Sequence, residues 1–311
     1  MELTREAYQT IVKNISNKSD LCRLARVSKA FQRAVEYVLY NTIYMRDSQR
    51  TMDLCNTLAA SGRLASLVNT FTLFIVDGDG GEEDSSENSN RITEEFWESL
   101  ASALRKVTRL RFLNIHVDGD ASQAWILREC TFQLRTFHCD FSWDSYLAGF
   151  LNTQMMLRDL YISDYSTNHD TAAQEEGDAS TIPSVLTIQQ HAMPLLTSFE
   201  CSFMDAMTCF VQGRPITRVK TCFSREDMPG KKQELDRLAV DLRRSTKRLR
   251  SLDLADSSYT EEFSLIILAE LAPKLPEVRY LGTLVLPVGL EVRSSSFSIC
   301  LGQWCISWPL S

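Results

Sequence analysis

The chain has 311 residues, of which 44% are hydrophobic and 23% charged, and its formal net charge is −7. These values are ordinary for a soluble globular protein of about two domains. The negative charge is concentrated in residues 77–90, which carry six acidic and no basic side chains, so the rest of the chain sums to −1. A nearly neutral body argues against a nucleic-acid or membrane-surface partner, which usually requires a basic protein.

The chain start and the cysteines indicate a compartment. The first residues lack the basic start and apolar core of a signal peptide. The longest apolar stretch, Leu281 to Leu290, is shorter than the ~18 residues of a membrane-spanning helix. The nine cysteines are an odd number without a C-x-x-C pair, which is typical of reduced thiols. We therefore expect a cytoplasmic and/or nuclear protein.

The first 45 residues predict three short amphipathic helices. Apolar residues recur at helical spacing around Ile11, Leu24 and Val35, with Ser19 and Ser28 as expected N-caps. A segment this small buries too little of its own surface to be stable alone. We therefore interpret residues 1–45 as a docking module that shares its apolar faces with something else.

The order of these residues resembles the F-box, the module that fastens a substrate receptor to a cullin-based ubiquitin ligase. The matching features are Leu3, Glu6, Ile11-Val12, Ile15, Asp20-Leu21, the run from Leu24 to Lys29, and Phe31. Thr4 stands where the family usually has proline, but threonine can also cap a helix. The resemblance implies a small all-helical fold, with a Skp-type adaptor and a cullin as partners. It implies adaptor-binding roles for Leu3, Glu6, Ile11, Leu21, Leu24, Val27 and Phe31. An ordinary helical bundle is the alternative.

A helical connector is predicted over residues 46–67, with a helix from Ser48 to Ala60 and a stop at Gly62. The chain then repeats an apolar-x-x-apolar-x-apolar unit, whose last three positions alternate as in a strand. The units start at residues 68, 110, 134, 157, 196, 216, 249 and 278. Four of the seven spacings fit the ~20–29 residues of leucine-rich repeats, and two longer ones contain the polar insertions 77–90 and 164–180.

Helical patterns lie between the strand units, over residues 93–104, 143–151 and 232–245. Ser258 and Glu261 match a capping box ahead of a further helix. The chain thus resembles F-box proteins with leucine-rich repeats. The resemblance implies an α/β fold class, in which a small all-helical F-box precedes an irregular leucine-rich-repeat solenoid over residues 68–290. Residues 291–311 form a tail that either caps the last repeat or reflects a gene model that ended early. A non-solenoid α/β domain remains the alternative.

The strand units also predict a binding surface. The first, fourth and sixth positions should point inward, so the third and fifth should line the opposite face. That face would carry aromatic and charged side chains suited to a protein or peptide. The predicted substrate-binding residues are Phe112, His138, Tyr161, Arg218 and Tyr280.

No catalytic motif is found in the sequence. The calcium-loop pattern that begins at Asp77 fails at its sixth and twelfth positions, Glu82 and Asn88, so a disordered loop without an ion is expected. Hydrolase, nucleotide-binding and metal-site spacings are also missing. Residues 231–250 carry eight basic and three acidic side chains, which fit a solvated helix face or an acidic partner better than nucleic acid. We expect a non-catalytic substrate receptor of a ubiquitin ligase that needs no cofactor. A repeat scaffold outside any ligase is the alternative, and an enzyme is a distant third.

Overall fold

The computed structural model of the chain describes residues 3–75, 92–117, 121–163, 187–202, 204, 206–255, 260–282 and 284–285. The predicted acidic loop 77–90, the insertion 164–180 and the tail 291–311 lie outside these residues. Contacts divide the chain into two compact units, residues 1–140 (unit 1) and 141–311 (unit 2). The boundary between the units, after residue 140, differs from the predicted boundaries at residues 45, 67 and 290. Those three boundaries stay predictions.

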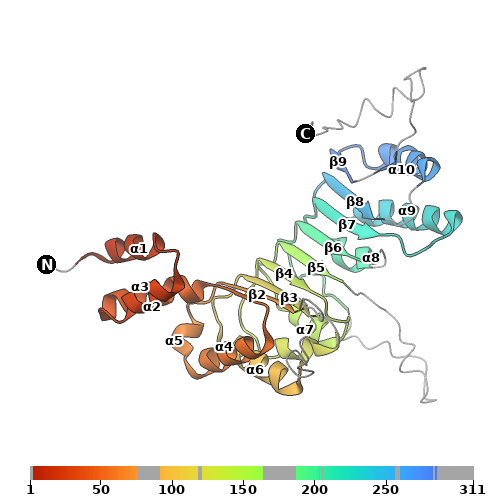
Figure 1. Ribbon diagram of the computed structural model, residues 1–311. Coiled ribbons are helices and arrows are strands. Elements are labelled where there is room, and N and C mark those ends of the chain that lie inside the picture. Colours follow the sequence, from red (N-terminus) through yellow and green to blue (C-terminus); the bar gives the residue numbers. More distant parts are fainter. Residues whose placement is uncertain are drawn as a thin grey trace, which may run out of the picture. The chain divides into compact units, whose positions relative to one another are not determined.

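Unit 1 begins with three helices, α1 (Arg5–Lys13), α2 (Lys18–Ala25) and α3 (Lys29–Asn41) (Figure 1). Each is started by a side chain that accepts from a backbone N–H of the first turn, which satisfies one of the free donors there. Thr4 accepts from Ala7, and Ser28 accepts from Phe31, as expected from the sequence. The predicted cap Ser19 is wrong, because α2 begins two residues earlier and Asn17 is its cap.

The rest of unit 1 alternates strands and helices. Strand β1 (Thr42–Met45) follows α3 directly and is followed by α4 (Ser48–Ala60) and α5 (Gly62–Ala65). Next come β2 (Thr70–Ile75), α6 (Glu94–Lys106), β3 (Phe112–Val117), the short 3₁₀ helix η1 (Gln123–Leu127) and β4 (Thr136–Cys139). The four strands are parallel and pair in chain order. Parallel neighbours joined by helical crossovers define an α/β architecture.

Unit 2 repeats this scheme. It contains α7 (Ser145–Asn152), β5 (Asp159–Ile162), β6 (Ser198–Cys201), α8 (Ala206–Val211), β7 (Arg218–Cys222), α9 (Met228–Leu242), β8 (Ser251–Ala255), α10 (Glu261–Lys274) and β9 (Tyr280–Leu281). Strands β5 to β9 are parallel and pair in chain order. Helices α8, α9 and α10 lie on one side of these strands (Figure 1). The predicted α/β class is therefore confirmed.

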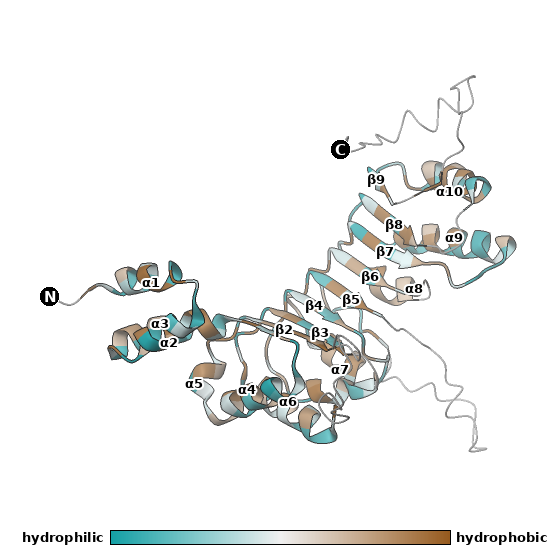
Figure 2. Ribbon diagram, in the orientation of Figure 1, coloured by the Kyte–Doolittle hydropathy of each residue, from teal (hydrophilic) through white to brown (hydrophobic). Residues whose placement is uncertain are grey.

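The inward positions of the strand units are confirmed by burial. All eight first positions, from Val68 to Val278, are buried. The fourth positions are buried from Phe71 to Leu252, and the sixth from Leu73 to Leu254. The last unit is weaker, because Leu281 is only half-buried and Thr283 lies outside the described residues. Brown and teal residues accordingly alternate along strands β5 to β8 (Figure 2). One face of each sheet is therefore packed against helices and the other is open.

Helix boundaries differ from the sequence predictions where capping decides them. Helix α4 has the predicted bounds, although Gly62 starts α5 rather than simply ending α4. Helix α9 starts four residues before the predicted Lys232, because Asp227 accepts from Gly230 and Pro229 occupies the first turn. Helix α10 is capped by Thr260, which accepts from Phe263, so the predicted cap Ser258 is wrong. Among the helices in the described ranges, none has the length and apolar content to span a membrane.

Candidate interaction surfaces

The three N-terminal helices bury only a small core. Its centre is formed by Val12, Leu21, Ala34 and Val35, and partly buried side chains such as Leu24 and Phe31 pack around it. Phe31 meets Tyr8 edge-on, with ring centroids 4.7 Å apart. Large apolar residues remain on the surface, because a module of this size has too few positions inside.

The structure separates the predicted adaptor-binding residues into two groups. Leu3, Ile11 and Val27 are 49%, 40% and 68% exposed, and Glu6 is also exposed. Leu24 and Phe31 are partly buried. Leu21 is only 3% exposed, so it supports the fold of the module and not its surface. Exposed apolar side chains just before α1, in α1 and in the α2–α3 turn are thus the available contact residues; their binding role stays a prediction.

An ion pair ties the module to the helical connector. Both guanidinium NH groups of Arg63 in α5 donate to the Glu36 carboxylate in α3. These hydrogen bonds lower the pKa of Glu36 and raise that of Arg63. Because Arg63 is largely exposed, solvent screening keeps the energetic contribution of the pair small.

The open sheet face of unit 1 carries a row of contacts that the sequence analysis missed. Phe74 on β2 stacks on His116 of β3, with centroids 4.6 Å apart and planes 17° from parallel. His116 Nδ1 contacts the Asp140 carboxylate, and the Arg46 guanidinium lies 5.8 Å from the centre of the Phe74 ring. Phe74, His116 and Asp140 are each the seventh position of their strand unit. A strand unit defined with seven positions instead of six would have predicted this row from the sequence.

Two predicted substrate-binding residues, Phe112 and His138, meet on the same face. They lie on the adjacent strands β3 and β4, and their rings are 6.1 Å apart. Tyr44 on β1 and Phe74 are exposed nearby on the paired strands β1 and β2. The face therefore presents several aromatic rings, which is typical of protein-binding surfaces.

The open face of unit 2 holds the other three predicted residues. Arg218 and Tyr280 are exposed and lie in one row across the strands, with Ser251 paired to both. Tyr161 lies in the next row, paired with Glu200. That row is largely neutralised, because Lys220 Nζ lies 2.7 Å from Glu200. The hydrogen bond to Glu200 raises the pKa of Lys220.

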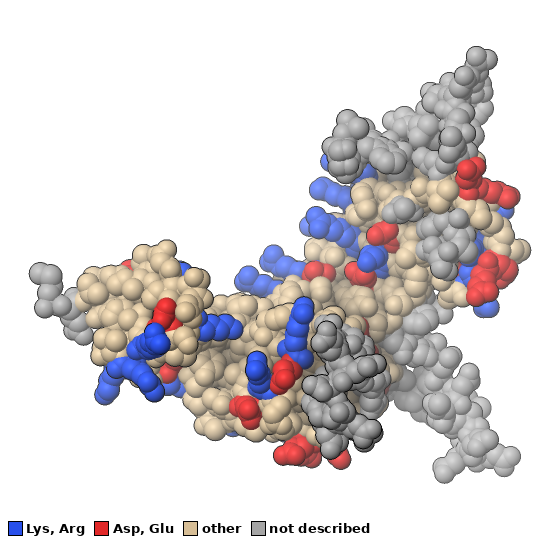
Figure 3. Space-filling view, viewed as in Figure 1, with Lys and Arg blue, Asp and Glu red and all other residues tan. Residues whose placement is uncertain are grey.

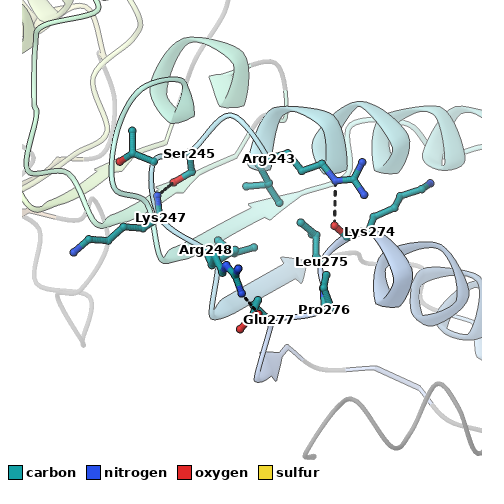
Figure 4. Close-up of a pocket in the computed structure, with 11 residues that line it drawn as sticks. Arg243, Ser245, Lys247, Arg248, Lys274, Leu275, Pro276 and Glu277 are labelled. Carbon is teal, nitrogen blue, oxygen red and sulfur yellow. Dashed lines mark hydrogen bonds and ion pairs between the residues drawn. The ribbon is translucent and has the colours of Figure 1, made fainter.

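A shallow pocket of about 340 Å³ lies where α9 and α10 end (Figure 4). Leu242, Leu249, Leu275 and Pro276 provide its apolar surface. Three of its basic side chains are engaged within the fold: Arg243 Nε donates to the Lys274 carbonyl at 3.1 Å, and Arg248 pairs with Glu277. Lys274 Nζ lies within 2.7 Å of Asp236 and Glu270. Cations at helix C-termini stabilise the helix dipole, which is the simplest role for Arg243 and Lys274.

In the described ranges, no group of three or more His, Cys, Asp or Glu side chains is placed to hold a metal ion. Burial raises the pKa of the Cys55 and Cys130 thiols to about 12, which keeps both protonated and unreactive. Protein-family models and curated proteins were compared with the chain, and none matches it.

Proposed function

We propose that the chain is a non-catalytic substrate receptor of a cullin-type ubiquitin ligase. In this proposal residues 1–45 are an F-box-like module that binds a Skp-type adaptor, and the strand–helix units are irregular leucine-rich repeats of a solenoid that bind a target protein. The cytoplasm or nucleus is the compartment that such a role requires.

The observation that carries the proposal is that some apolar residues of the N-terminal helices form a core while others stay exposed on the surface. Leu21 and Val35 form a small core, whereas Leu3, Ile11 and Val27 remain on the surface. Large apolar side chains left exposed on a small module are candidates for a docking surface. The open sheet faces, with Phe112, Tyr161 and Tyr280, support a second binding surface.

The alternative is a scaffold protein in which the N-terminal helices only cap the first strands. The direct connection from α3 into β1 and the Glu36–Arg63 pair favour this reading, because both fasten the helices to the rest of unit 1. The two functions differ in one respect: only the receptor captures a Skp-type adaptor and a cullin.

The test is capture of a purified Skp-type adaptor by the full chain and by an Ile11→Ser, Val27→Ser double variant. Burying each of these side chains at an interface is worth roughly 1.5–3 kcal/mol, so we expect about a hundredfold weaker capture. The matched control is Met155→Ser with Val240→Ser, because both are exposed apolar residues of unit 2. The control should bind as the wild type does.

Circular dichroism establishes that both double variants are folded. Equal capture by the folded Ile11, Val27 variant and the control would refute the predicted docking surface. Failure of the wild-type chain to bind adaptor and cullin at all would favour the scaffold.

A further inference from the structure

The residues that immediately precede the strands of unit 2 form one row across the sheet. Their backbones are linked in sequence: Thr197 N–H donates to the Arg158 carbonyl (2.9 Å), and Arg279 N–H donates to the Arg250 carbonyl (2.8 Å). The strand register continues this row without a break from β5 to β9. We call this row, together with Arg218 at the start of β7, the strand-start edge; its members are Arg158, Thr197, Thr217, Arg218, Arg250 and Arg279.

The strand-start edge carries four arginines. Arg158, Arg218, Arg250 and Arg279 are all exposed, and none forms an ion pair with another described residue. Figure 3 shows Lys and Arg side chains gathered along the side of the sheet where these strands begin. Arg250 and Arg279 are direct neighbours in the row, and like charges on adjacent strands destabilise a sheet. An anionic partner would remove this repulsion.

Apart from Asp159, which pairs with Ser198 at the β5 end of the Arg218 row, the remaining groups around the edge are suited to binding carboxylates. Ser198 and Ser251 flank Arg218 on the adjacent strands, and Tyr280 follows Ser251 in the same row. Guanidinium and hydroxyl groups donate hydrogen bonds to anionic oxygens, and arginine binds carboxylates through two parallel bonds. The edge thus combines charge with directional donors.

The dimensions fit an extended polypeptide. Neighbouring strands lie about 4.8 Å apart, so Arg158 and Arg279, four strands apart, are separated by about 19 Å, the length of about six extended residues. Alternate side chains of such a segment point to the same side, so about three acidic residues would reach the four arginines.

Nucleic acid fits the surface less well. Glu200 and Asp253 lie farther along the same strands and would repel any polyanion that extends beyond the strand-start edge, as a long phosphodiester chain would. Single-stranded nucleic acid also binds through a series of stacking rings, whereas Tyr280 is the one aromatic residue in the Arg218 row.

We propose that the strand-start edge of unit 2 binds an extended, Asp- and Glu-rich segment of another protein. The assignment of that segment to a ligase target rests on the proposed function, but the binding itself does not require the adaptor.

The experiment measures binding of a fluorescent peptide of about ten residues, with Glu at every second position, to the full chain by fluorescence anisotropy. The same peptide with Gln in place of Glu and a single-stranded oligonucleotide are compared. The test variant is Arg218→Gln, Arg250→Gln, Arg279→Gln. The control variant is Arg225→Gln, Lys232→Gln, Arg237→Gln, which removes the same charge from the segment leading into α9 and from α9 itself.

We expect the Glu peptide to bind the wild type and the control equally, and the test variant about tenfold more weakly. The Gln peptide should not bind, and added salt should weaken binding of the Glu peptide. Equal affinity of test and control variants, with both folded by circular dichroism, would overturn the proposal, as would tighter binding of the oligonucleotide. Adaptor capture, measured on the same variants, should be unchanged, so failure here is distinguishable from failure of the proposed function.

Discussion

Arg214 allows the sharpest prediction from the structure. It is 1% exposed, and its guanidinium contacts backbone carbonyls instead of a carboxylate. Nε donates to Ala192 (2.9 Å), one terminal NH group to Cys209 (2.8 Å) and the other to Gln189 (2.9 Å). Burial lowers the pKa of Arg214. The side chain therefore joins α8 to the segment that leads into β6, where Met193 adopts a left-handed conformation with φ 52°.

Replacing Arg214 with Met keeps an unbranched apolar stem but removes these three bonds and a longer one, of 3.4 Å, to the Gln212 carbonyl. Each hydrogen bond from a charged donor is worth ~1.5–3 kcal/mol, and the recovered desolvation energy of the guanidinium offsets several kcal/mol of that sum. The net loss should be about 2–4 kcal/mol, because the carbonyls of Ala192, Cys209 and Gln189 lose a donor and the strained backbone at Met193 loses its support.

Hydrogen exchange of the Ala192 and Met193 amides measures this loss locally, since both amides are bonded to backbone carbonyls, of Gln189 and Gln154. Their exchange should accelerate about thirtyfold to a thousandfold in Arg214→Met. Arg244→Met is the control, because Arg244 is exposed and pairs only with Asp241 three residues away; it should change exchange about twofold or less. Unchanged or slower exchange in Arg214→Met would show that desolvation of the buried charge outweighs its bonds.

Three further predictions follow from individual contacts. Leu21→Ala should destabilise the N-terminal helices by about 2–4 kcal/mol, whereas Val27→Ala should change stability by less than about 0.5 kcal/mol, as measured by exchange of α2 and α3 amides. Because the folded pKa of Glu36 is lowered, its pair with Arg63 stabilises the fold at neutral pH and is lost as pH falls through that pKa. Glu36→Gln should therefore lower the melting temperature slightly at neutral pH but not near pH ~3, and an equal effect at both would contradict the ion pair. Iodoacetamide at mildly alkaline pH should modify the exposed Cys22 and leave Cys55 unmodified, because burial raises the pKa of Cys55 to about 12; mass spectrometry of tryptic peptides decides this.

The sequence by itself determined the alternation of buried and open positions in the strand units. Phe71, Leu113 and Leu252 point inward because side chains on a strand alternate with a period of two, and this period is readable without any tertiary information. The sequence predicted a helix N-cap correctly only where a single capping residue preceded the helix. Ser28 was such a case, whereas Ser19 competed with Asn17 and Ser258 with Thr260.

Only the tertiary structure decided which apolar residues of the N-terminal helices are core and which are surface. Leu21 and Val27 both belong to apolar helical patterns, but the packing of α1 and α2 on α3 buries the first and leaves the second exposed. The same holds for contacts between residues far apart in the chain. Arg214 bonds Ala192 and Gln189, and Arg250 lies beside Arg279, because parallel pairing sets their register. Local periodicity contains no information on such register, since it depends on the lengths of the intervening helices and loops.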